Sequence, residues 1–339
     1  MSKATPQLFA LVQSFFQNHL HAVRGASEHT VRAYRDGLRL FFLFAAEHQG
    51  RPIAQLHLDD IRCEVVLAFL DHLEVSRGNS PATRNCRLAA IRSFAEHLLR
   101  QDLTRAEQYR RILAIPAKRT TTRPPCYLEP EEVRAVIEQP DPTTAAGARD
   151  LSLLLFLYNT GARVGEALAV KREDLSLRHP RQVRLHGKGG KERYCPLWPE
   201  TTQALQVLLN RHHPDHEPAA VVFRSARGTP LTRDGVGYLL AKYSSRAAET
   251  VPHLHQRRVT PHSLRHSCAV ALLQAGVDLT VIRDYLGHVS VATTNRYLST
   301  NLEMKRQVLE AFWHRAGLMK RTQRPWHPTA SVLAFLESL

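Results

Sequence analysis

Two histidines, an arginine and a tyrosine lie close together near the C-terminal end of the chain. His262 and Arg265 are one helical turn apart and follow Thr260, which precedes a proline in a pair typical of a helix start. His288 follows a Leu-Gly pair, and Tyr297 comes shortly after it. Arginine stays charged and binds phosphate through forked contacts, histidine exchanges protons near neutral pH, and a tyrosine hydroxyl can act as a nucleophile. These residue types predict chemistry on a phosphodiester.

Two basic residues further upstream fit the same chemistry. Arg163 follows a glycine-containing turn at which a phosphate could approach the backbone, and Glu166 comes one helical turn later. An ion pair at a helix start is the alternative interpretation of these two residues. Lys188 lies at the glycine-rich tip of a β-hairpin predicted over residues 182–197. The G-K-G-G-K sequence at this tip lacks the spacing of a nucleotide-binding loop.

A tyrosine hydroxyl has a pKa near 10 and is a weak nucleophile at neutral pH. Its attack on a phosphodiester requires positive charge on the non-bridging oxygens and a proton for the leaving alcohol. Arg163 and Arg265 are the candidates for the charge, although they must be brought together by folding. The chain has neither a nucleotide loop nor an acidic metal cluster, so we expect no metal and no cofactor.

The ordered set of motifs resembles the tyrosine recombinases, also called the phage integrase family. The H-x-x-R box of that family matches His262 and Arg265, and its L-G-H box ends at His288. Its nucleophile falls at Tyr297. Its first arginine box, T-G-x-R-x-x-E, matches residues 160–166, and its G-K-G-x-K-E-R hairpin matches residues 187–193.

The resemblance implies a role for each of these residues. Lys188 would be the general acid for the leaving 5′ oxygen, His262 an acid or base near the nucleophile, and His288 a hydrogen-bond donor to the phosphate. Glu166 would orient these catalytic residues without contacting the DNA itself. The product would be a 3′-phosphotyrosyl link to Tyr297, which a free 5′-hydroxyl of another strand reverses. The implied partners are double-stranded DNA at a specific site and further copies of the chain, in a tetramer on two paired sites.

Two alternatives remain at this point. A type IB topoisomerase shares the chemistry but rejoins the same strand, and a catalytically idle DNA-binding protein shares the scaffold. The N-terminal helical domain and the C-terminal tail favour recombination over the first, and the complete catalytic set opposes the second. Integration, excision, transposition and resolution all stay open, as does the DNA recognition sequence.

The bulk composition agrees with a nucleic-acid partner. The 339 residues contain 46 Lys and Arg against 31 Asp and Glu, which gives a net charge of +15 and a pI of about 10.1. Such a basic chain favours a polyanion as partner. The five cysteines are scattered, which suits a reducing compartment. No membrane-length apolar run or secretion signal is evident, so we expect a cytoplasmic, DNA-associated protein.

Apolar spacing predicts a mainly α fold with a small β-sheet. Four N-terminal helices are expected over residues 5–23, 27–50, 58–73 and 80–98. Residues 1–115 resemble the SAM-like core-binding domain of the family, and residues 127–319 resemble its catalytic domain. Between them, residues 116–126 are rich in proline, threonine and basic side chains and predict an extended linker. The two domains are expected to form a clamp around DNA.

The tail, residues 320–339, is apolar behind a basic, proline-containing joint and would dock either on its own core or on a neighbouring protomer. Basic side chains on the N-terminal helices and on the hairpin are predicted to track DNA phosphates, which carry no sequence information. A solvated surface is the alternative for these residues, which are Arg32, Arg35, Arg84, Arg87, Arg92, Lys191 and Arg193.

Overall fold

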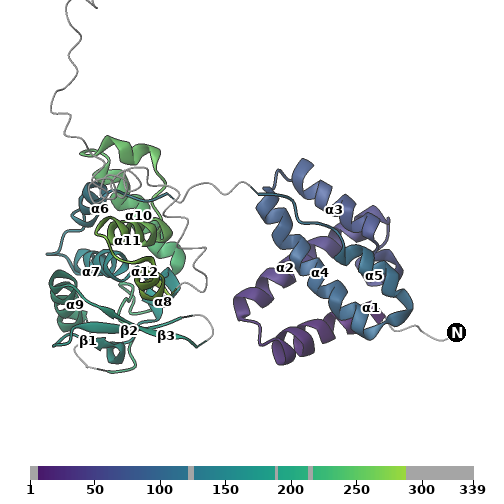
Figure 1. The fold of residues 1–339 in the computed structure, drawn as a ribbon, viewed down its shortest axis with the longest axis horizontal. Coiled ribbons are helices and arrows are strands. Elements are labelled where there is room, and N and C mark those ends of the chain that lie inside the picture. The colour runs from purple at the N-terminus through teal and green to yellow at the C-terminus, as the bar shows by residue number, and fades with distance from the viewer. Residues whose placement is uncertain (1–6, 121–125, 188–189, 213–216, 288–339) are drawn as a thin grey trace, which may run out of the picture. The chain divides into compact units, whose positions relative to one another are not determined.

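The computed structural model describes residues 7–120, 126–187, 190–212 and 217–287. The chain divides into two compact units, residues 1–122 and 123–339 (Figure 1). Both are mainly helical, and the second holds a three-stranded antiparallel sheet, so the predicted fold class is confirmed. Among the helices within the described ranges, none is long and apolar enough to cross a membrane.

The first unit consists of helices joined by short turns. Their bounds are α1 (Gln7–Ser14), the π-helix η1 (Phe15–Val23), α2 (Glu28–His48), η2 (Ile53–Gln55), η3 (Leu58–Asp60), α3 (Cys63–Val75), α4 (Pro81–Gln101), η4 (Leu103–Arg105) and α5 (Ala106–Leu113). The four expected helices are present, with two changes: the first adopts π winding from Phe15, and the third begins at Cys63 after a separate 3₁₀ turn. Helix α5 was not predicted.

Side-chain caps explain where the two longest helices of this unit begin. The Ser27 hydroxyl accepts a hydrogen bond from the Thr30 amide, and the Ser80 hydroxyl accepts one from the Thr83 amide, each at 3.3 Å. Each bond satisfies an amide that has no partner within its own helix. Pro81 adds a backbone angle that suits the first helical turn. Both predicted starts are confirmed.

Helices α2 and α4 pack closely in the core of the first unit. A Cβ atom at Gly37 of α2 would lie 3.1 Å from the Ala90 Cβ of α4, so small residues allow this close approach. Around the crossing, Phe41, Phe69 and Phe94 are fully buried and contribute to edge-on aromatic contacts. The five N-terminal arginines predicted to contact DNA all lie on α2 and α4.

The second unit begins with helices, continues through the sheet and returns to helices. Its elements are α6 (Pro130–Ile137), α7 (Ala145–Thr160), α8 (Val164–Ala169), η5 (Arg172–Asp174), β1 (Leu175–Ser176), β2 (Gln182–His186), β3 (Glu192–Pro196), α9 (Pro199–His212), α10 (Arg233–Ala247), η6 (Pro252–Gln256), α11 (Pro261–Gln274) and α12 (Leu279–Leu286). The predicted hairpin is confirmed as β2 and β3. An isolated bridge also joins Lys171 and Val221.

Helix α7 is the central element of the second unit. It packs against α9 and α11, while α12 lies against β3 and α11, and α8 lies against β2 (Figure 1). The sheet and the end of α12 are thereby brought together with the turn that follows α7. Tyr243 of α10 ties a further helix to α7 by donating a 2.7 Å hydrogen bond to buried Asp150.

The bond between Tyr243 and Asp150 leads to a stability prediction. Tyr243→Phe leaves a buried carboxylate without one of its donors and should lower the free energy of unfolding by about 2 kcal/mol. The control is Tyr238→Phe on the same helix, where the ring is 70% exposed and the change should stay within about 0.5 kcal/mol. Urea denaturation followed by circular dichroism measures both. Equal effects would show that the buried bond contributes nothing.

Candidate active site

The turn after α7 places Arg163. Gly161 ends the helix with a φ of +55°, a backbone conformation that residues other than glycine rarely adopt. A Cβ atom at this position would also overlap the Leu286 Cδ2 and lie 3.3 Å from the Cys268 Sγ. Because α7, α11 and α12 meet here, only glycine fits. Arg163 then stands at the start of α8 with its side chain 43% exposed.

Arg265 lies on the second turn of α11 and is almost completely buried, at 1% exposure. Thr260 fixes the start of this helix, because its hydroxyl accepts a hydrogen bond from the Ser263 amide at 3.1 Å. The Arg265 guanidinium donates to the Gly161 carbonyl at 2.5 Å and to the Leu286 carbonyl at 2.7 Å. It therefore joins the turn that carries Arg163 to the end of α12.

Three arginines from three different elements hold successive carbonyls at the end of α12, residues 285–287, which we call the α12 terminus. Arg193 Nε donates to the Tyr285 carbonyl at 2.9 Å, and Arg163 Nη2 donates to the Gly287 carbonyl at 3.3 Å. Arg265 binds the Leu286 carbonyl between them. The last carbonyls of a helix lack partners within it and carry partial negative charge, so cations are stabilised there.

Glu166 supplies the negative charge within this group of arginines. One of its oxygens accepts from Arg163 Nη1 at 2.7 Å, and the other accepts from the Arg163 amide at 3.0 Å and from Arg193 Nη2 at 2.8 Å. Burial raises the pKa of the Glu166 carboxyl, but the hydrogen bonds and charges of Arg193 and Arg163 outweigh burial and hold this pKa below its ordinary value. The group therefore stays ionised at neutral pH.

His262 lies on the first turn of α11, close enough to Arg265 and Arg163 for their charges to act on its ring. Its ring meets that of His266 edge-on, with centroids 4.2 Å apart. Although the residue as a whole is exposed, neighbouring atoms crowd the ring. This desolvation, together with the positive charges of Arg265 and Arg163, lowers the pKa of His262 below its ordinary value. A neutral imidazole at physiological pH can accept a proton.

The three remaining catalytic candidates, Lys188, His288 and Tyr297, lie outside the described residues. The structure does describe the residues directly before Lys188 and His288. The Gly187 amide donates to the Lys191 carbonyl at 2.7 Å, which closes the base of the hairpin tip. Gly287, which precedes His288, ends the α12 terminus with a φ of +67°.

The predicted DNA contacts have unequal exposure. Arg32 and Arg35 are exposed, and each pairs with an acidic neighbour on its own helix. Arg84 is buried and lies 3.2 Å from Glu74. The other N-terminal candidates, Arg87 and Arg92, are partly buried, whereas Lys191 is exposed. A DNA contact by any of these side chains stays a prediction.

Arg193 has a position that sequence reasoning missed. The sequence predicts a DNA contact for it, yet its side chain is 12% exposed and binds Glu166 and the α12 terminus. Strand alternation places its side chain on the same face as Cys195, a small apolar residue that is fully buried. This pairing was the available sign that Arg193 faces inward.

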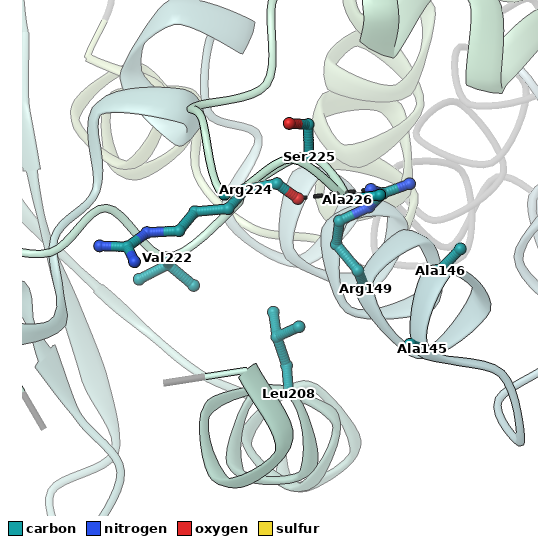
Figure 2. Close-up of a pocket in the computed structure, with 9 residues that line it drawn as sticks. Ala145, Ala146, Arg149, Leu208, Val222, Arg224, Ser225 and Ala226 are labelled. Atoms are coloured by element: carbon teal, nitrogen blue, oxygen red, sulfur yellow. Dashed lines mark hydrogen bonds between the residues drawn. The ribbon is translucent and has the colours of Figure 1, made fainter. Parts of the chain in front are cut away.

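A cavity of about 280 Å³ lies elsewhere in the second unit, near the start of α7 and beside α9 (Figure 2). Arg149 donates to the Arg224 carbonyl at 3.3 Å and is ion-paired with Asp150 at 2.6 Å, whereas the Arg224 side chain points away from it. The cavity wall includes none of the predicted catalytic residues. Within the described ranges, no group of three or more His, Cys, Asp or Glu residues could hold a metal ion.

The arrangement of Arg163 and Arg265 is suited to binding an anion with more than one oxygen. Their guanidiniums donate to adjacent carbonyls of the α12 terminus, so they converge from separate parts of the chain. Planar guanidiniums held this way match phosphate oxygens. A neutral histidine lies beside them. Positive charge for the phosphate oxygens and a proton acceptor are two of the parts that phosphoryl transfer requires.

Comparison with known families and proteins agrees with this geometry. The phage integrase family matches residues 126–317, and the N-terminal SAM-like domain of phage integrases matches residues 14–102. The "Putative integrase/recombinase y4rC" of Sinorhizobium fredii is 40% identical over 332 residues, which cover 98% of each chain. The tyrosine recombinase XerC of Myxococcus xanthus is 34% identical over 308 residues, which cover 89% of this chain and 97% of XerC.

Solved structures share the fold. The XerH site-specific recombinase bound to its palindromic difH substrate has a TM-score of 0.64 at 22% identity, covering 93% of this chain and 92% of XerH. The Tn1549 transposon integrase in complex with transposon right end DNA also has a TM-score of 0.64, at 16% identity, covering 89% and 98%. At these identities the likeness concerns the fold alone. The family matches and the full-length relatives show that the chain belongs to the phage integrase family and is a tyrosine recombinase, an enzyme that breaks and rejoins DNA strands.

Proposed function

We propose that this recombinase acts on double-stranded DNA at a specific site, with Tyr297 as the nucleophile and Arg163, Lys188, His262, Arg265 and His288 as the other catalytic residues. The observation that carries the proposal is the convergence of Arg163 and Arg265 on adjacent carbonyls directly before His288. In the DNA complex, the scissile phosphate would bind where these two guanidiniums converge.

The chemistry then follows from the proton and charge at each atom. The Tyr297 oxygen attacks phosphorus and passes its proton to neutral His262, while the bond to the 5′ oxygen breaks and Lys188 protonates that oxygen. Arg163, Arg265 and His288 stabilise the charge on the non-bridging oxygens. The 3′-phosphotyrosyl link keeps the energy of the broken bond, so the 5′-hydroxyl of a partner strand reverses the step without ATP.

The assembly belongs to the same proposal. Residues 1–115 and 127–319 would be the two parts of a clamp around DNA, connected by the linker 116–126. Four protomers would hold two paired sites inside the cell, with the tail 320–339 docked in cis or exchanged. The proposal is supported by relatives of the same architecture whose structures contain DNA, such as XerH with difH and the Tn1549 integrase with transposon end DNA.

Removing the nucleophile tests the assignment of Tyr297. Tyr297→Phe should bind DNA as the wild type does, because only the hydroxyl is lost, but should form no covalent complex. A nicked suicide substrate followed by denaturing electrophoresis measures the adduct, and a mobility shift measures binding. A covalent adduct at the wild-type level would refute the assignment.

A second prediction concerns the exposed guanidinium. Arg163→Lys keeps the charge but loses the fork between Glu166, the Gly287 carbonyl and the phosphate. The rate of covalent-complex formation at saturating DNA should fall by about 100- to 1000-fold. The control is Arg211→Lys, an exposed arginine on α9 that donates to the Pro142 carbonyl and should be neutral. Similar rates for both variants would exclude Arg163 from the site.

The lowered pKa of His262 predicts a pH profile. An imidazolium cannot accept the tyrosine proton, so the cleavage rate should hold down to pH 6.5 and decline only below it. His262→Gln should cleave about 100-fold or more slowly and should lack this acidic limb. Single-turnover cleavage between pH 5 and 8 measures both enzymes. An acidic limb that persists unchanged in the variant would show that another group accepts the proton.

A further inference from the structure

Arg193 lies where three parts of the proposed site meet. It belongs to β3, the strand that leads out of the hairpin whose tip carries Lys188, and it pairs with Leu185 of β2. Its strand neighbours Glu192 and Tyr194 are 44% and 59% exposed, whereas the Arg193 side chain is 12% exposed. The side chain therefore faces the interior of the second unit.

The Arg193 guanidinium donates hydrogen bonds to two different groups. Nη2 donates to the Glu166 carboxylate at 2.8 Å, and Nε donates to the Tyr285 carbonyl at 2.9 Å. The same group packs against the backbone at Gly287, where an added Cβ would lie 3.0 Å from Nη1. Lysine has no fork that could hold a carboxylate and a carbonyl in fixed geometry, so this position calls for arginine.

The charge balance connects Arg193 to Arg163. Glu166 is 8% exposed and carries one negative charge, which it shares between the two arginines. Without Arg193, burial would raise the pKa of Glu166, and Arg163 would be the one arginine left to pair with the carboxylate. Arg163 would then be drawn toward Glu166 and away from the position at which it reaches the Gly287 carbonyl.

We propose that Arg193 is a positioning residue, which fixes Arg163 through Glu166 and holds the α12 terminus in place, rather than a contact to the DNA backbone. The inference rests on the proposed function, because Arg163 and His288 are its catalytic groups. It adds that the lysine hairpin, the first arginine and the segment before His288 are joined through one guanidinium.

The test compares Arg193→Gln with Lys191→Gln, which removes the same charge from an exposed position on the same hairpin. The logarithm of the binding constant falls linearly with the logarithm of the salt concentration. Loss of one side chain that contacts phosphate makes this slope less steep by about 0.9. For Arg193→Gln we expect an unchanged slope, an affinity within about threefold of the wild type, and a cleavage rate at saturating DNA that falls by about 30-fold or more. Lys191→Gln should make the slope less steep.

A double-mutant cycle identifies the route. If Arg193 acts in part through Glu166, Arg193→Gln should slow cleavage by a clearly smaller factor in a Glu166→Gln background than in the wild type. Equal losses of cleavage rate in both backgrounds would overturn the inference. So would a salt slope that becomes less steep for Arg193→Gln by as much as it does for Lys191→Gln.

Arg193→Lys gives an independent result, also if the glutamine variant fails to fold. A phosphate contact would tolerate lysine, whereas the fork between carboxylate and carbonyl would not, so the cleavage rate should drop while binding is kept. Full activity of Arg193→Lys would refute the positioning role. If the wild type itself forms no covalent complex, the proposed function fails instead, and the salt slopes still decide whether Arg193 contacts DNA.

Discussion

The geometry of the site depends on the unpaired carbonyls at the end of α12. Three successive carbonyls, from Tyr285 to Gly287, each receive a guanidinium donor from a different element. A helix end presents such acceptors because its last carbonyls have no partners within the helix. The arginines satisfy these acceptors and are themselves held in fixed positions, which a long, flexible side chain cannot achieve alone.

Like charges so close together require compensation. Glu166 provides it at the centre of the group, with Arg163 on one side and Arg193 on the other. The arrangement leaves Arg265 buried and Arg163 partly exposed, and both guanidiniums are held at the α12 terminus. Desolvation, together with the positive charges of Arg265 and Arg163, lowers the pKa of His262, which links these arginines to the protonation state of the neighbouring imidazole.

Local signals made most elements predictable. Ser27, Ser80 and Thr260 cap helices as their residue types indicate, and the alternating segment on either side of residues 187–190 forms the expected hairpin. The ion pair of Arg163 with Glu166 is present, and another nitrogen of the same guanidinium reaches the Gly287 carbonyl. Phosphate binding by Arg163 stays a prediction.

Features that depend on tertiary contacts were less predictable. Alternation with buried Cys195 indicates that Arg193 faces inward, but it does not reveal the partner, an α12 terminus about 90 residues away in sequence. The π winding from Phe15 and the separate turn before α3 have no local signal that we can identify. Arg84 has the residue type of a DNA contact, but its burial against Glu74 depends on how α3 and α4 pack.

The central claim is that Arg163 and Arg265 bind one and the same phosphate beside the nucleophile. A structure of the Tyr297→Phe variant bound to its DNA site measures this directly. We expect both guanidiniums within hydrogen-bond distance of the non-bridging oxygens of the scissile phosphate, with the ring of residue 297 directed at its phosphorus. Guanidiniums bound to different phosphates, or a ring at position 297 remote from both, would contradict the account.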